Sequence, residues 1–275
     1  YSTDWGDTWI PLKEGERVEI ENVNDRVYIK GNNPNGFSHG EETYTQFEIE
    51  GTVEISGSVM SLVDGRGAST IIPSDYCFSH LFENCKINRI MEMYPLPALT
   101  LKAHCYSYMF AGCEKLLGPV MVLPATQLEP YCYSHMFDGC TSIANPSELP
   151  AEELAEGCYS HMYSGCSYLC VFSGSFASLP ATKLAPYCYS GMFSDCVSIY
   201  EAPELPASNL EDYCYEAMFS GCTILKKAPL LRAKKLAKGC YSQMFSFCES
   251  LNNVFALPAE DLSEQCYYHM FDGCT

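Results

Sequence analysis

The chain has 275 residues, a formal net charge of −18 at pH 7 and 17 cysteines. Such an acidic chain lacks the basic face that binds phosphate, which argues against nucleic acid and anionic lipid as partners. No run approaches the roughly 20 apolar residues of a membrane-spanning helix, so we expect no membrane-spanning segment.

Residues 1–70 carry no repeat and alternate apolar with polar residues, as strands do. The alternating segments are residues 17–20, 26–29, 46–50 and 52–55, and turn-rich stretches separate them. The pattern predicts a small antiparallel β unit. Because the terminal apolar face of a repeat stack needs a cap, we expect this unit to cap the repeats that follow.

From residue 71 to 275 the chain consists of eight repeats of about 26 residues, each close to Cys-Tyr-Ser-x-Met-Phe-x-Gly-Cys. The first cysteines follow one another at intervals of 28, 27, 26, 30, 26, 26 and 26 residues. A fixed period in this range predicts a solenoid, in which each unit buries its apolar face against its neighbours. The cysteine pairs are Cys77/Cys85, Cys105/Cys113, Cys132/Cys140, Cys158/Cys166, Cys188/Cys196, Cys214/Cys222, Cys240/Cys248 and Cys266/Cys274.

Local spacing predicts one short helix in each repeat. Leu154, Cys158, Met162 and Cys166 recur every four residues, which is typical of an apolar helical stripe. Glycines after these segments suit a left-handed C-terminal cap. The proline-punctuated segments between them, such as residues 198–207, predict a turn and a short strand that stacks into a parallel sheet. The expected fold class is therefore α/β.

Residues 136–143 and 244–251 resemble the BspA-like leucine-rich repeats of bacterial surface proteins, in which Ala-Phe-x-Gly-Cys-x-x-Leu follows a short strand. The present repeats are longer and add an upstream Cys and Tyr. The resemblance covers about three quarters of the chain. It implies a right-handed leucine-rich-repeat solenoid, an extracellular or bacterial cell-surface location, and adhesion to a host or microbial protein or glycan. It carries over no catalytic residue.

The cysteines admit two interpretations. Eight helical residues rise about 12 Å, beyond the roughly 7 Å limit between bridged Cα atoms, so disulfides could form only between neighbouring repeats. The alternative is buried, reduced thiols that act as small apolar side chains. Cys170 has no counterpart in other repeats. The spacing does not suit zinc, so we expect no structural metal and no cofactor.

The motif also predicts the core. Its expected members include Cys132, Met136, Phe137, Cys140, Cys214, Met218, Phe219 and Cys222. A row of tyrosines lies one helical step from the cysteine stripe. Either its hydroxyls lie in water, or its rings form an aromatic platform for a glycan or protein. Its members are Tyr106, Tyr133, Tyr159, Tyr189, Tyr215, Tyr241 and Tyr267.

Two other sets of residues recur. His80, His135, His161 and His269 share one register, which indicates a solvated helix surface or, alternatively, a metal or pH site. Acidic residues before the helices complement the helix dipole or, if stacked, could bind calcium. The acidic clusters are Glu152, Glu153 and Glu156; Glu211 and Asp212; and Glu260, Asp261 and Glu264.

One repeat reverses the charge pattern. Between Thr223 and Gly239 there are six bases and no acid, so this segment carries +6 and the rest of the chain −24. It either relieves repulsion among neighbouring acids or forms a docking patch for an acidic partner. The candidate partner-binding residues are Lys226, Lys227, Arg232, Lys234, Lys235 and Lys238.

The sequence shows no nucleophile elbow, phosphate loop or recurring carboxylate pair, so we expect no enzyme activity and no catalytic residue. Residues 64–67 favour a turn over a ligand loop. The predicted function is recognition of a protein or glycan. The alternative is a non-catalytic spacer or assembly module, with an end-to-end dimer through the last repeat. A glycan-active enzyme ranks third and requires two carboxylates within about 10 Å in a cleft.

Overall fold

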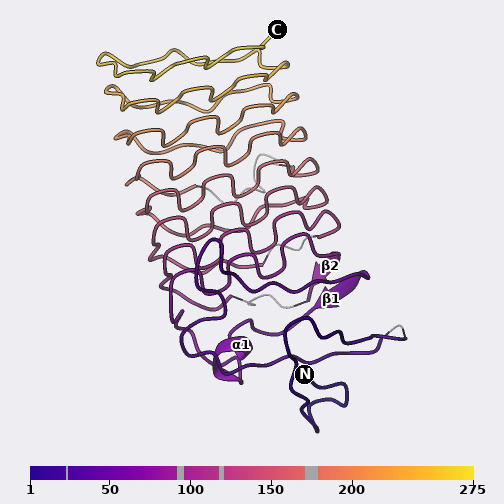
Figure 1. Ribbon diagram of the computed structural model, residues 1–275. Coiled ribbons are helices and arrows are strands. Elements are labelled where there is room, and N and C mark those ends of the chain that lie inside the picture. The colour runs from indigo at the N-terminus through magenta and orange to yellow at the C-terminus, as the bar shows by residue number, and fades with distance from the viewer. Residues whose placement is uncertain (23, 92–95, 118–120, 171–178) are drawn as a thin grey trace.

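The computed structural model describes residues 1–22, 24–91, 96–117, 121–170 and 179–275. Successive repeats form coils that stack along one axis, with the N-terminal unit at one end (Figure 1). The regular elements are β1 (Val53–Ile55), α1 (Ser61–Asp64) and β2 (Ile87–Ile90), and β1 and β2 form a two-stranded parallel sheet. Most of the described chain is non-regular, so the fold is α/β only in a loose sense.

The segments expected to be helical are runs of turns. Every second backbone N–H donates to a carbonyl of the next coil, as Phe78 N does to Cys105 O at 2.9 Å. The N–H groups between them donate three residues back, as Ser79 N does to Tyr76 O at 2.9 Å. An α-helix would need both sets of donors for its own i→i−4 bonds. The prediction of a helix in each repeat is therefore wrong, because pairing between coils replaces it.

Every fourth residue of these segments lies in the left-handed region. In the second coil φ is 54° at His104, 55° at Tyr108 and 69° at Gly112. Each four-residue turn brings the chain back to the same side of the coil, whereas four residues of an α-helix drift by about 40°. The spacing of cysteine and methionine by four therefore reflects the turn unit and not a helix.

Apart from β2, the described segments between the turn runs pair in parallel through single bridges. Glu153 bridges Lys183, Glu201 bridges Lys227, and Lys227 bridges Asn253. The prolines in these segments lack the N–H that would extend a ladder, so pairing stops after one residue. The longest connection, beginning at Ser167, falls in part outside the described residues.

The core is a set of columns that run along the stack. The rings of Phe110, Phe137 and Tyr163 stack with centroids 5.7 and 5.4 Å apart. Burial of side chains of this size stabilises the fold by roughly 1.5–3 kcal/mol each. The core residues named from the motif are all at most 3% exposed: Cys132, Met136, Phe137, Cys140, Cys214, Met218, Phe219 and Cys222.

The N-terminal unit differs from the antiparallel β unit that we expected. Among its described residues, segments 17–20, 26–29 and 46–50 form no strand, and Tyr28 makes only a single antiparallel bridge with Ser2. β1 pairs in parallel with β2 of the first repeat. The alternation still has a structural role, because Phe47 and Ile49 pack against the core.

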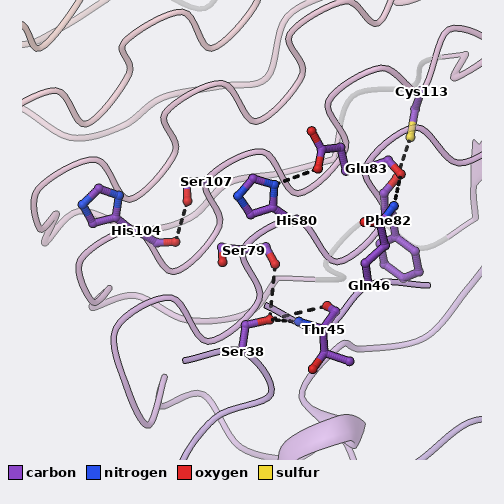
Figure 2. Close-up of polar contacts among 10 residues, drawn as sticks. All are labelled: Ser38, Thr45, Gln46, Ser79, His80, Phe82, Glu83, His104, Ser107 and Cys113. Carbon is purple, nitrogen blue, oxygen red and sulfur yellow. Dashed lines mark hydrogen bonds and ion pairs between the residues drawn. The ribbon is translucent and has the colours of Figure 1, made fainter. Parts of the chain in front are cut away.

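Residues 38–47 of this unit satisfy the outward carbonyls of the first coil (Figure 2). Phe47 N donates to Leu81 O and Gln46 Nε2 donates to Glu83 O, both at 2.9 Å. Ser38 Oγ lies 3.4 Å from Ser79 O. These are the acceptors that an additional coil would otherwise use, so the unit meets the hydrogen-bonding requirement at this end of the stack.

Candidate functional site

The structure divides the candidate basic patch into two groups. Lys227 and Arg232 line a depression of about 220 Å³, and Lys226 Nζ lies 5.0 Å from the ring centroid of Tyr200. Lys234, Lys235 and Lys238 belong to the next stretch of the coil and do not line the depression. The six cations therefore do not act as one surface.

The second group pairs with acids one coil further along the stack. Lys234 Nζ lies 3.4 Å from Glu260 Oε1, Lys235 Nζ 4.0 Å from Asp261 Oδ2, and Lys238 Nζ 3.1 Å from Glu264 Oε2. The hydrogen bond and charge of Glu264 raise the pKa of Lys238. These contacts support the interpretation that this group offsets neighbouring acids. Because the pairs are largely exposed, solvent screens them and they contribute little to stability.

The depression lies where three neighbouring coils meet. Its charged lining comes from Glu201, Glu204, Lys227 and Arg232, and Leu230 and Phe255 add exposed apolar surface. Arg232 Nη2 lies 3.5 Å from Glu204 Oε2, whereas Lys227 has no ion pair within the described parts of the chain. The site therefore combines one free ammonium, one paired guanidinium and two apolar side chains.

Sequence reasoning identified the cations of this site but not its other residues. One signal could have located it. Six repeats read Leu-Pro-Ala just before the motif, whereas residues 231–233 read Leu-Arg-Ala. Leu231 and Ala233 are buried, as are their counterparts in the five preceding Leu-Pro-Ala repeats, so the substituted position projects outward as Arg232.

The histidine register forms a stacked column and not a freely solvated surface. His80, Tyr108, His135 and His161 stack in this order, with ring centroids 4.5–4.8 Å apart. His80 and His135 each contact a carboxylate through Nδ1 at 2.8 Å, those of Glu83 and Asp138. The stacking covers the ring faces, so the column presents only ring edges to a partner.

His161 differs from its neighbours. Its Nδ1 contacts Ser160 Oγ at 3.0 Å and no carboxylate. Burial and then the neighbouring His135 lower its pKa, against a smaller opposing effect of Asp138. His269, four coils away, pairs with Asp272. The four histidines therefore do not converge on one site.

The tyrosine row is a core column, which corrects both interpretations of it. Tyr106, Tyr133, Tyr159, Tyr189, Tyr215 and Tyr241 are at most 2% exposed, and only Tyr267 is half-buried. Successive rings stack 5.7–6.0 Å apart. The row therefore offers neither exposed hydroxyls nor a platform for a glycan.

All 17 cysteines are free thiols, and 15 are buried. Thiols of the second motif position donate to a carbonyl of the preceding coil, as Cys140 Sγ does to Phe110 O at 3.0 Å. Burial raises the pKa of Cys77 to about 11 and that of Cys132 to about 12. A thiol is nucleophilic as its thiolate, so these groups are poorly reactive at neutral pH.

Several of the remaining candidate residues have structural contacts. Glu153 pairs with Lys183 of the next coil, and Tyr131 Oη donates to Glu156 Oε1 at 3.0 Å. Asp64 accepts four backbone N–H bonds from residues 66–69 at 2.6–2.9 Å, as a turn requires. The described residues contain no group of three or more His, Cys, Asp or Glu side chains placed to hold a metal ion.

Comparison with known proteins gives no relative: no protein-family model, no curated protein and no solved structure matches the chain. Within the described residues, no helix has the length and apolarity needed to cross a bilayer.

Proposed function

We propose that the chain is a non-catalytic recognition protein of the leucine-rich-repeat class, similar to BspA-like surface proteins, that binds a protein or glycan outside the cell. The depression around Lys227 and Arg232 carries this proposal. It combines Lys227, which has no ion pair among the described residues, with exposed Leu230 and Phe255 on an otherwise strongly acidic chain. Stacked coils extend this surface, so affinity can arise from many modest contacts.

The partner chemistry follows from the lining. Lys227 favours an anionic group, and Leu230 and Phe255 favour an adjoining apolar group. Glu201 and Glu204 at the same site disfavour a uniformly anionic polymer, since like charges across an interface are costly. An acidic segment with a neighbouring apolar side chain therefore fits this surface better than a polyanion.

The test compares two double variants that remove the same charge. Binding to a panel of extracellular-matrix proteins and glycans is measured for Lys227→Gln/Arg232→Gln and for Lys234→Gln/Lys235→Gln. We expect the first variant to lose at least about tenfold in affinity and the second to stay within about twofold, because Lys234 and Lys235 do not line the depression. Equal binding by both variants would contradict the proposal.

A structural spacer is the second candidate, favoured by the regularity of the stack. Backbone bonds of 2.6–3.1 Å join each turn run to the next, as between Phe137 N and Met162 O at 2.9 Å. Such a stack resists bending. If this is the function, small-angle scattering will show a rigid rod, and neither variant pair will affect binding.

An end-to-end dimer would need apolar contacts. In the last described coil the N–H groups of Tyr267, His269, Phe271 and Gly273 have no acceptor among the described residues. If two such coils packed face to face, the N–H donors of one would face the N–H donors of the other and could not form hydrogen bonds. Leu262 and Tyr268, 62% and 50% exposed, are therefore the groups on which a dimer would depend.

Hydrolysis of a glycan is the least supported candidate. Glu201 and Glu204 both line the depression, but the Glu204 side chain is 87% exposed and pairs with Arg232. A general acid of this kind requires a carboxyl group in a desolvated environment.

A further inference from the structure

The core contains hydroxyl groups that no side chain or backbone group among the described residues satisfies. The Oη atoms of Tyr106, Tyr133 and Tyr159, in three successive coils, are buried and have no hydrogen-bond partner among the described residues. Their rings are nearly parallel, with centroids 5.7 and 5.9 Å apart. The three hydroxyls therefore lie about one coil apart along the same column.

Two further hydroxyls belong to the same region. Tyr163 is the one tyrosine in a column that is otherwise phenylalanine from Phe82 to Phe271. Its Oη accepts the Ser147 backbone N–H at 2.8 Å, which leaves the phenolic hydrogen available for donation. Ser147 Oγ is itself buried and lies beside the Tyr163 hydroxyl: burial raises the pKa of Tyr163, and a hydrogen bond from the Ser147 side chain opposes this effect. Burial raises the pKa of Tyr133, and among the smaller contributions is the nearby Tyr163.

Dry hydroxyls at these positions would be costly. A buried donor without an acceptor loses its hydrogen bonds to water without replacement, and phenylalanine of almost the same size would avoid that cost. The first coil has Phe78 at this position, so the column accommodates phenylalanine, yet the other seven coils have tyrosine. The hydroxyls are therefore expected to have a partner that is small, polar and able both to donate and to accept.

Water meets these requirements. Two hydrogen bonds of about 2.8 Å span about 5.6 Å, close to the spacing of the stacked rings. Buried waters typically bond to two to four otherwise unsatisfied polar groups. The chemical neighbours otherwise available are ring carbons and the thiols of the first cysteine row, such as Cys132, which are weak partners.

We infer that ordered water molecules bridge the hydroxyls of Tyr106, Tyr133, Tyr159, Tyr163 and Ser147, and form a buried file along the stack. The site is internal and separate from the depression at Lys227, so it does not depend on the proposed function. The file would link neighbouring coils through polar contacts inside an apolar core.

A crystal structure of the full chain at about 1.5 Å resolution tests the inference directly. We expect peaks within hydrogen-bonding distance of at least two of the Tyr106, Tyr133 and Tyr159 hydroxyls, and the loss of such a peak in Tyr133→Phe. Density showing only carbon and sulfur around these hydroxyls would overturn the inference.

Denaturant unfolding provides a second measurement. We expect Tyr133→Phe to lower the folding equilibrium constant about fivefold, because the water loses a partner. Tyr267→Phe, at a half-buried member of the same row, should stay within about twofold. Unchanged or greater stability of Tyr133→Phe would show that the Tyr133 hydroxyl has no water partner. If the two measurements disagree, the electron density of the crystal structure decides.

Discussion

The ring of Tyr131 lies against Gly157 of the next coil, so closely that a Cβ on Gly157 would be 2.2 Å from the Tyr131 Cε1 atom. Gly157 has a φ of 55°, close to the 53° of Tyr131 at the equivalent position. The fold therefore tolerates larger residues in this left-handed position. What requires glycine here is the ring of the preceding coil. Stacked columns of this kind end at a glycine, because the missing side chain leaves room for the last ring.

This relationship gives a prediction for Gly157→Ala. We expect a loss of about 2–4 kcal/mol in the free energy of unfolding, because the ring must move and the left-handed conformation is strained. The matched control is Gly139→Ala, where φ is 70° but the nearest atom to a Cβ is 3.8 Å away. It should lose about 1 kcal/mol, and equal losses in denaturant titrations would contradict the role of Tyr131.

The second prediction concerns thiol reactivity. In the native protein, iodoacetamide should modify Cys170 and Cys274 first, since the other 15 cysteines are buried. After unfolding, all 17 should react. Mass spectrometry of timed samples gives the order, and early modification of Cys132 or Cys140 would contradict the packing described for the core.

The third prediction concerns pH. Burial lowers the pKa of His104 and His161 below the ordinary value of 6.5, so the unfolded chain binds their protons more tightly. Stability should therefore be full above about pH 6.5 and fall as the pH drops toward the folded-state pKa values. Melting temperatures measured from pH 7.5 to 5 should show this slope.

The substitution His161→Gln should reduce the same pH slope, because it removes one of the two protonation equilibria. His269→Gln, at an exposed histidine paired with Asp272, provides the comparison. Identical slopes in wild type and His161→Gln would remove this histidine from the explanation.

The fourth prediction concerns the N-terminal cap. Gln46→Leu should destabilise the fold by about 1–2 kcal/mol, because it leaves Glu83 O without the Gln46 donor. Arg17→Leu in the same unit removes only an exposed ion pair with Glu50 and should cost less than about 1 kcal/mol. Equal costs would mean that the unit does not stabilise the stack through the carbonyls of the first coil.

The fifth prediction separates the two cysteine rows. Cys140→Ser keeps a donor for Phe110 O, so its cost should be about 1 kcal/mol or less. Among the described residues, Cys132 makes no thiol bond to a neighbouring coil like that of Cys140 and is fully buried, so Cys132→Ser should place a more polar group in an apolar site and cost about 1–3 kcal/mol. Thermal unfolding of the two variants compares these costs directly.

The sequence by itself determined the repeat boundaries, the residues of the core and the one coil with reversed charge. These follow from period and composition, which are local properties: Cys132, Met136 and Phe137 recur at fixed intervals because each coil buries the same face. The spacing of cysteine and methionine also argued against an α-helix, because residues repeated strictly every four positions drift around a helix of 3.6 residues per turn.

Only the tertiary structure decided how the backbone is paired and which cations are free. A turn run that gives every second N–H to the next coil can form only when that coil is in place, so no local propensity reveals it. The tertiary structure also decided the charge pairing. Lys227 and Lys234 belong to the same basic segment, but Lys234 pairs with Glu260 of the next coil, whereas Lys227 lines the depression. Contacts between residues about 26 positions apart made that difference.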